Sequence, residues 1–157
     1  MPRVFLTSLV LLAAAAPGAG AAEPDLWATV NVCDTVAHQD EIGIRASMPA
    51  RAAGAGMFMR FRVQYRNAAE RRWRHVTDAD SGWRRVGRAR GRAIQSGWSF
   101  QVAGGGTQLL RGVAHFQWRR NARVVARERQ LTTGGHQSTA GADPRDFSAA
   151  TCKIDPR

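Results

Sequence analysis

The sequence lacks the short motifs that mark most enzyme families. It contains no GxSxG segment for a nucleophilic serine, no HExxH segment for zinc, no Walker loop and no GxGxxG segment that opens a helix. The triple glycine at 104–106 has neither the lysine nor the hydroxyl residue of a phosphate-binding loop, so we interpret it as a hairpin loop. None of the four histidines has another histidine at metal-ligand spacing. We therefore expect no cofactor and no metal ion, and a role in binding or structure rather than catalysis.

A helical pattern is missing as well. The segment 84–92 is basic, but Gly87 and Gly91 interrupt it and it has no apolar face at helical spacing. Short segments that alternate apolar and polar residues occur instead, and we place Trp98 and Trp118 on their inward faces. We predict strands over residues 27–33, 41–47, 57–67, 73–76, 83–86, 98–102 and 149–154, and a hairpin over 109–131. Seven to nine short strands joined by turns predict an all-β fold, an antiparallel β-sandwich.

The predicted hairpin at 109–131 has alternative registers. A three-residue loop places Trp118 opposite Val124, which leaves one face of the hairpin apolar and the other basic. A two-residue loop places Phe116 opposite Arg127 and mixes core residues with solvent residues. Because a shift of one residue moves every side chain to the other face of a strand, the hydrophobic pattern favours the three-residue loop.

The N-terminal residues 1–22 are typical of a secretory signal peptide. Arg3 supplies the positive start, and an apolar run over 4–16 is too short to span a membrane stably. Small residues follow at the expected cleavage site; an uncleaved anchor is the alternative. No other segment approaches membrane-spanning length. The sequence thus predicts a secreted, extracellular protein whose mature part, residues 23–157, is a single domain and a monomer.

The chain contains two cysteines, Cys33 and Cys152. In an exported domain of this size, a lone pair of cysteines usually forms a disulfide. This bond would close a loop of more than a hundred residues and contribute at most about 4–5 kcal/mol in the chain-entropy description. A metal site or a redox pair is the alternative, but the two cysteines lie far apart and no CxxC segment is present.

Several segments resemble a known group of proteins. FRVQYR, WRHV, GWRRVG, WSFQV and LLRGVAHFQWRRNARVV, followed by a late cysteine, are similar to uncharacterised secreted bacterial proteins with an immunoglobulin-like or fibronectin-type-III-like β-sandwich. The resemblance covers Phe58 to Cys152 and implies that fold and an exported location, but no catalytic residues. This chain departs from the group at Asn121-Ala122, where a glycine-containing turn is expected, and it lacks the Cys…Trp…Cys arrangement of antibody domains.

Positive charge is the best functional signal. The chain has 23 lysines and arginines, only one of them a lysine, against 12 acidic residues. The preference for arginine matches a GC-rich genome, whereas the net charge favours anionic partners. In an immunoglobulin-like sandwich, the strand at 57–67 shares a sheet with the hairpin, so we expect a basic face of exposed side chains: Arg60, Arg62, Arg66, His115, Arg119, Arg127 and Arg129. Its ligand would be an anionic cell-surface or extracellular polymer rather than a specific nucleic acid; an ordinary solvated strand face is the alternative.

Two other classes of function stay open. Trp73 and Trp83 are flanked by arginines, and exposed indole rings there would stack on sugars, as in a lectin-like domain. A secreted hydrolase would need a site in the loops, built from the remaining titratable groups His38, His75, Asp78 and Asp80. A calcium site at the same two aspartates would need further acidic ligands, which this turn lacks.

Overall fold

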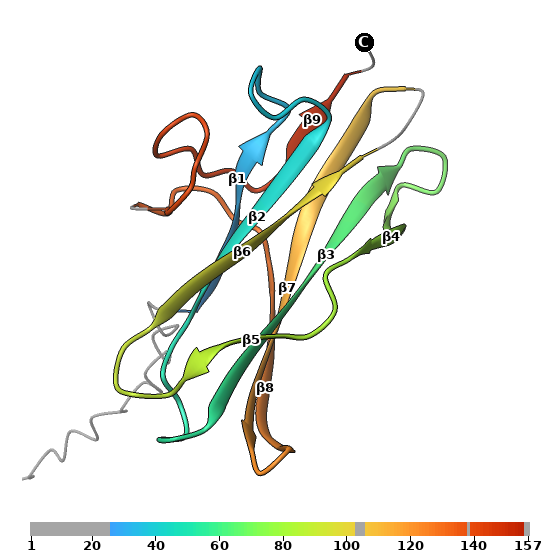
Figure 1. Ribbon diagram of the computed structural model, residues 1–157. Helices are drawn as coiled ribbons and strands as arrows, with labels where there is room; N and C mark the ends of the chain where they lie inside the picture. The colour runs from blue at the N-terminus through green and yellow to red at the C-terminus, as the bar shows by residue number, and fades with distance from the viewer. Residues whose placement is uncertain (1–25, 103–105, 138, 156–157) are drawn as a thin grey trace, which may run out of the picture.

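The computed structural model describes residues 26–102, 106–137 and 139–155 (Figure 1). The predicted signal peptide, residues 1–22, and two of the three glycines at 104–106 lie outside these ranges. Within these ranges, nine strands form two antiparallel sheets that pack together, which confirms the predicted all-β sandwich. Among the described residues, no helix is long and apolar enough to cross a membrane.

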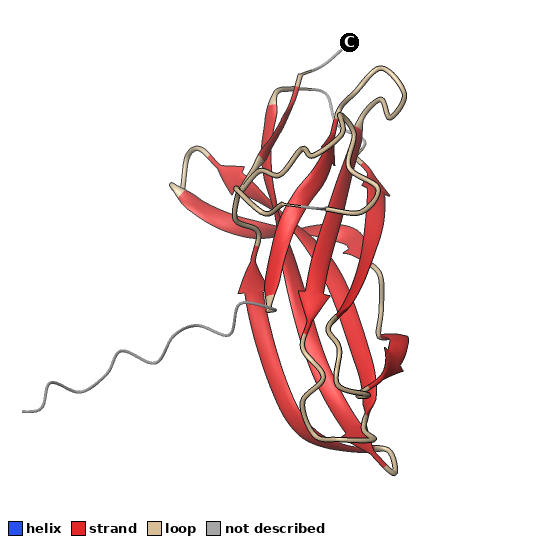
Figure 2. Cartoon of the chain, turned by 90° about the vertical axis from the view of Figure 1, so that its left-hand side faces the viewer, coloured by secondary structure: helices blue, strands red, loops and turns tan. Residues whose placement is uncertain are grey.

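The two sheets differ in size. The smaller sheet has three strands, in the order β1 (Trp27–Cys33), β2 (Glu41–Met48) and β6 (Ile94–Gln101). The larger sheet has six, and its central path runs β4 (Arg72–Asp80), β3 (Gly56–Asn67), β7 (Gln108–Arg120) and β8 (Arg123–Leu131). Two short strands complete it, β5 (Arg84–Arg88) beside β3 and β9 (Cys152–Ile154) beside β7. Figure 2 shows that the long strands run along the length of the molecule.

Alternating side chains of β3 explain how the sheets pack. Four of its inward residues are fully buried: Met57, Met59, Phe61 and Val63. They belong to one hydrophobic cluster with residues of the smaller sheet such as Val30, Ile42 and Ile44. Each side chain buried in this way stabilises the fold by about 1.5–3 kcal/mol. The sheets approach so closely at Gly112 of β7 that a Cβ there would lie 2.7 Å from the side chain of Ile44.

The turn between β7 and β8 differs from the prediction of a three-residue loop. Asn121 and Ala122 form a two-residue loop, and their φ angles are +48° and +64°, as a type I′ turn requires. Val125 is then bulged out of the ladder, so that Trp118 pairs with Ala126 rather than with the predicted valine. The bulge offsets the shift that a two-residue loop alone would cause. Phe116 and Trp118 therefore still face the core and Arg127 still faces outward, although Glu128 lies opposite Phe116.

Two further predictions were wrong. Trp98, expected in the core, keeps 38% of its surface exposed, because β6 is an edge strand. The guanidinium of Arg84 lies 4.1 Å from the centre of its ring. The strand predicted at 73–76 is longer, because the chain pairs again with β3 at its end, where Asp80 lies opposite Arg62.

The irregular segment after β8 covers the free edge of β1. Val30 and Ala149 exchange two backbone hydrogen bonds, of 2.9 and 3.0 Å. The chain then reaches β9, where Cys152 is bonded to Cys33 with a Cα–Cα distance of 5.4 Å. This confirms the predicted disulfide, which ties β1 of the smaller sheet to β9 of the larger one. Such a bond indicates an oxidising compartment.

Candidate functional site

The residues predicted to form the basic face lie on three neighbouring strands of the larger sheet. Arg60, Arg62 and Arg66 are on β3, His115 and Arg119 on β7, and Arg127 and Arg129 on β8. His115 lies opposite Arg60 on one side and opposite Arg129 on the other, and the alternating burial of β3 shows that this row faces away from the core. The structure therefore brings all seven residues onto one outer face, here called the basic face. It divides them into two groups with different surroundings.

On the β4 side of the basic face, an acidic residue forms ion pairs with two of the arginines. Arg60 donates from Nε to Asp80 at 2.7 Å and contacts the same carboxylate with Nη2, while Nε of Arg62 lies 3.3 Å from it. The hydrogen bond from Arg60 is the main reason why the pKa of Asp80 is lowered to about 2. Both arginines are half-buried, whereas the sequence predicted exposed side chains. Asp80 thus offsets one of these two positive charges, whereas Arg66 on the same strand is exposed and is in no ion pair of the described chain.

Trp73 also lies on the β4 side, beneath two cations. The guanidinium groups of Arg111 and Arg66 lie 4.2 and 5.9 Å from the centre of its ring. Arg111 is fixed there because its Nε donates to Gln64 at 2.8 Å. The half-buried indole thus makes cation–π contacts with both arginines. In the lectin-like alternative, a sugar would have to replace these arginines on the ring.

On the β8 side, the arginines are unpaired. Arg127 and Arg129 are exposed, and no ion pair in the described part of the chain involves either of them or Arg119. With Trp83 and His115, the two β8 arginines help to line a shallow depression of about 500 Å³. Guanidinium groups around a hollow of this kind can donate hydrogen bonds to an anion.

His115 contributes less positive charge than the sequence suggests. Its Nε2 atom is buried and has no hydrogen-bond partner in the described structure. Burial is the main cause that lowers the pKa of this imidazole, and the nearby cations Arg129, Arg62 and Arg60 lower it further, as does His75. Because its pKa lies below the ordinary value of 6.5, His115 is uncharged at neutral pH and gains its proton only on acidification.

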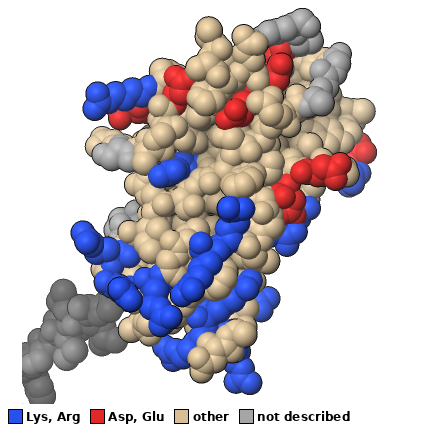
Figure 3. Space-filling model, viewed as in Figure 1, with Lys and Arg blue, Asp and Glu red and all other residues tan. Residues whose placement is uncertain are grey.

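A second hollow, here called the end hollow, lies where the same face meets the β7–β8 turn. Its volume is about 330 Å³, and its cationic lining residues are Arg85, Arg88, Arg119 and Arg120. Figure 3 shows that arginines gather over the lower half of the molecule, where β5 and this turn lie, whereas most acidic residues in that view lie above. Sequence analysis missed the hollow, because the arginine-rich segment at 84–92 gave no sign that β5 pairs with β3. Only the density of arginines there could have drawn attention to it.

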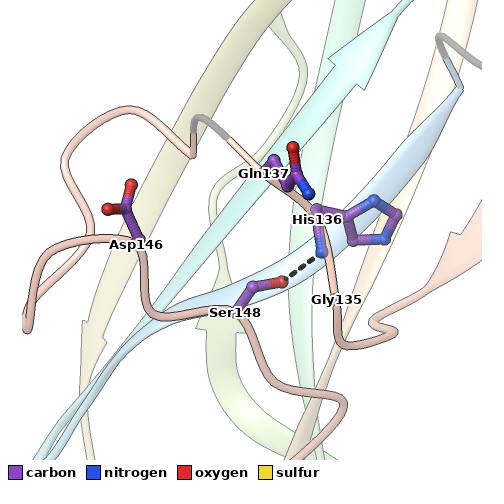
Figure 4. Close-up of a pocket in the computed structure, with 5 residues that line it drawn as sticks. All are labelled: Gly135, His136, Gln137, Asp146 and Ser148. Atoms are coloured by element: carbon purple, nitrogen blue, oxygen red, sulfur yellow. Dashed lines mark hydrogen bonds between the residues drawn. The ribbon is translucent and has the colours of Figure 1, made fainter.

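A third hollow, of about 470 Å³, lies in the segment after β8 and contains a histidine and a serine (Figure 4). The hydroxyl of Ser148 accepts a hydrogen bond from the backbone N–H of His136 at 3.0 Å, not from its imidazole. The imidazole instead stacks on Trp27, with ring centres 4.7 Å apart, and its Nε2 lies 2.7 Å from Oγ1 of Thr133. A serine nucleophile needs the imidazole as its base, so this arrangement is not that of a serine hydrolase.

The groups considered for a hydrolase lie apart. His38 is in the loop between β1 and β2, with Glu41 as its partner at 3.3 Å. His75, Asp78 and Asp80 are on β4 in the other sheet. Across residues 26–102, 106–137 and 139–155, no three His, Cys, Asp or Glu side chains are placed to hold a metal ion.

Comparison with known proteins gives no relative: no protein-family model, no curated protein and no solved structure matches this chain. The candidate site therefore rests on the geometry and charge of the chain itself.

Proposed function

We propose that this protein is an exported, non-enzymatic binding module that contacts an anionic polymer of the cell envelope or the extracellular space through its basic face. The observation that carries this proposal is the β8 side of that face, where Arg127 and Arg129 stand exposed and unpaired beside Arg119. Guanidinium groups bind phosphate and carboxylate groups through two parallel N–H donors. The formal net charge of +11 adds attraction at longer range.

Export and fold family are part of the same proposal. Residues 1–22 have the sequence of a signal peptide, and the disulfide suits an oxidising compartment. Within the β-sandwich class, the resemblance of Phe58 to Cys152 supports an immunoglobulin-like domain. A non-enzymatic role is supported by the separate contacts of His38 and Asp80, which are engaged by Glu41 and Arg60 respectively.

A matched pair of variants tests the proposed function. Arg127→Gln/Arg129→Gln removes two charges from the basic face, and Arg90→Gln/Arg92→Gln removes two from the exposed loop after β5. On a polyanion column, we expect the first variant to elute at clearly lower salt than the second. All retention should weaken steeply with salt, because exposed charges are screened over about 10 Å at 0.1 M. If both variants elute together, the protein responds only to net charge, and the proposal fails.

A further inference from the structure

We propose that the end hollow is a subsite for a phosphate group of the bound polymer. This inference rests on the proposed function and adds the chemical class of the ligand and the place where it is held. Arg85, Arg88, Arg119 and Arg120 supply the hydrogen-bond donors.

The hollow lies at a glycine, which has no side chain, in a row of paired residues that crosses three strands. Gly56 of β3 pairs with Arg88 of β5 on one side and with Arg119 of β7 on the other. Because neighbouring strands lie about 4.8 Å apart, the two arginines start from backbone positions roughly 10 Å apart. A Cβ at position 56 would lie 3.0 Å from the ring of Phe58, so glycine lets this ring lie at the floor between them. Two long guanidinium side chains can close on a small anion across this gap.

Contacts within the protein hold two of the arginines in place before any ligand binds. Arg119 lies 4.2 Å from the centre of the Phe58 ring, and its Nε donates to Gln117 at 2.9 Å. Arg120 donates from Nη2 to the carbonyl of Ala53 at 3.1 Å. Each guanidinium uses one N–H group in this way and keeps the others for a ligand. Side chains that are already ordered lose less conformational entropy on binding.

The arrangement of donors around the hollow favours phosphate over carboxylate. None of its described lining residues is acidic, and no ion pair of the described chain involves any of the four arginines. The tetrahedral oxygens of a phosphate group accept hydrogen bonds from several directions. A carboxylate has two coplanar oxygens, which suit one guanidinium rather than a ring of them.

The end hollow adjoins the depression on the basic face. Arg119 lines the hollow and lies 5.2 Å from the ring of Trp83, which lines the depression together with Gln117. A polymer chain can therefore occupy both, with one phosphate in the hollow and further anionic groups beside Arg127 and Arg129.

Three double variants, each lacking two positive charges, separate this subsite from the basic face. They are Arg85→Gln/Arg88→Gln in the hollow, Arg127→Gln/Arg129→Gln on the face and Arg90→Gln/Arg92→Gln as the control. Dissociation constants are measured at one salt concentration for inorganic polyphosphate and for poly-glutamate. We expect the hollow variant to lose roughly tenfold in affinity for polyphosphate, and no more than the control for poly-glutamate. The face variant should lose affinity for both polymers.

A charge-neutral variant checks the shape of the subsite. Gly56→Ala narrows the hollow without removing an arginine, so it should weaken polyphosphate binding and leave poly-glutamate binding unchanged. Inorganic phosphate is the second probe: if it binds the hollow as tightly as each phosphate of the polymer, the ligand is a free phosphate and the polymer subsite is overturned.

The outcomes distinguish the two proposals. If the hollow variant loses no more polyphosphate affinity than the control while the face variant still loses affinity, the phosphate subsite is overturned and the proposed function stands. If all three variants behave alike with both polymers, both proposals fail.

Discussion

At one end of the larger sheet, Cys152 of β9 is bonded to Cys33 of β1, and Asp155 accepts hydrogen bonds from Lys153 at 2.9 Å and Thr107 at 2.8 Å. At the other end, beside the β7–β8 turn, arginines surround the end hollow and no ion pair of the described residues neutralises them. Figure 1 shows β9 and that turn at opposite ends of the molecule. The disulfide and the end hollow thus lie at opposite ends of the molecule.

This difference bears on the origin of the positive charge. A compositional preference for arginine acts on the whole chain alike, so it explains how many arginines there are but not why four of them line one hollow. Unneutralised cations at close range repel one another and oppose folding. The proposed phosphate subsite would explain why four of them line one hollow. The following changes test how differently the two ends behave.

Removing the disulfide should have the largest effect. We expect Cys33→Ala/Cys152→Ala to lower the free energy of unfolding by about 2–5 kcal/mol, because the bond spans 119 residues of sequence. At the other end, Arg85→Gln/Arg88→Gln should change it by less than about 0.5 kcal/mol, since both side chains are exposed. Urea unfolding followed by tryptophan fluorescence measures both. If both variants lost the same free energy of unfolding, the disulfide end would contribute no more to stability than the end hollow.

Replacing Asp80 should have an intermediate effect, because this carboxylate pairs with two half-buried arginines. We expect Asp80→Asn to lower the free energy of unfolding by about 1–2 kcal/mol at pH 6. Asp78→Asn, which removes the same charge from an exposed position of β4, is the control and should have little effect.

Acid should remove the contribution of Asp80. Its pKa of about 2 lies below the ordinary value of 3.8, so the native state favours the charged form. The stability this provides is complete above about pH 4 and is lost as pH falls towards 2. Unfolding measured at pH 6 and pH 2.5 should therefore show a gap between wild type and Asp80→Asn that narrows in acid. A gap that stays constant would contradict the ion pair.

His115 should give the smallest effect. Its pKa is lowered in the native state, so the native state resists protonation more than the unfolded chain does. The stability that follows is present above pH 6.5 and falls as pH drops below it. When the pH is lowered from 7.5 to 5.5, the free energy of unfolding of His115→Gln should fall less than that of wild type. The difference between the two changes should be under about 1 kcal/mol. His75 also has a lowered pKa, so some dependence will remain in the variant. If the free energy of unfolding of the variant depends on pH as steeply as that of wild type, His115 is not the group that causes this dependence.

Local patterns predicted much of the fold. Strict alternation over 57–67 identified both the buried set and the outward set of β3, because a strand with one buried face repeats every two residues. The cysteine pair needed only counting, since Cys33 and Cys152 had no other candidate partner. The strand at Trp27–Cys33 was predicted with its observed bounds from a similar alternation, although the structure buries residues on both of its faces.

What the sequence could not supply is the pairing between distant segments. The bulge at Val125 depends on how β8 fits against β7, and the exposure of Trp98 depends on β6 having no outer neighbour in the described sheets. The end hollow depends on Arg88 and Arg119 flanking Gly56 from two other strands. A period-two pattern states which way a side chain faces but not which strand lies beside it.

The outer edge of β8 has no strand paired with it among the described residues, whereas the edge of β1 is covered by Ala149 and its neighbours. An open edge offers unpaired N–H and C=O groups to any other strand, including β8 of a second copy. Two copies that met there would bring Arg127 and Arg129 of one chain against the same residues of the other. Like charges at that distance repel, so the arginines on β8 keep the exposed edge of the sheet from becoming a site of aggregation.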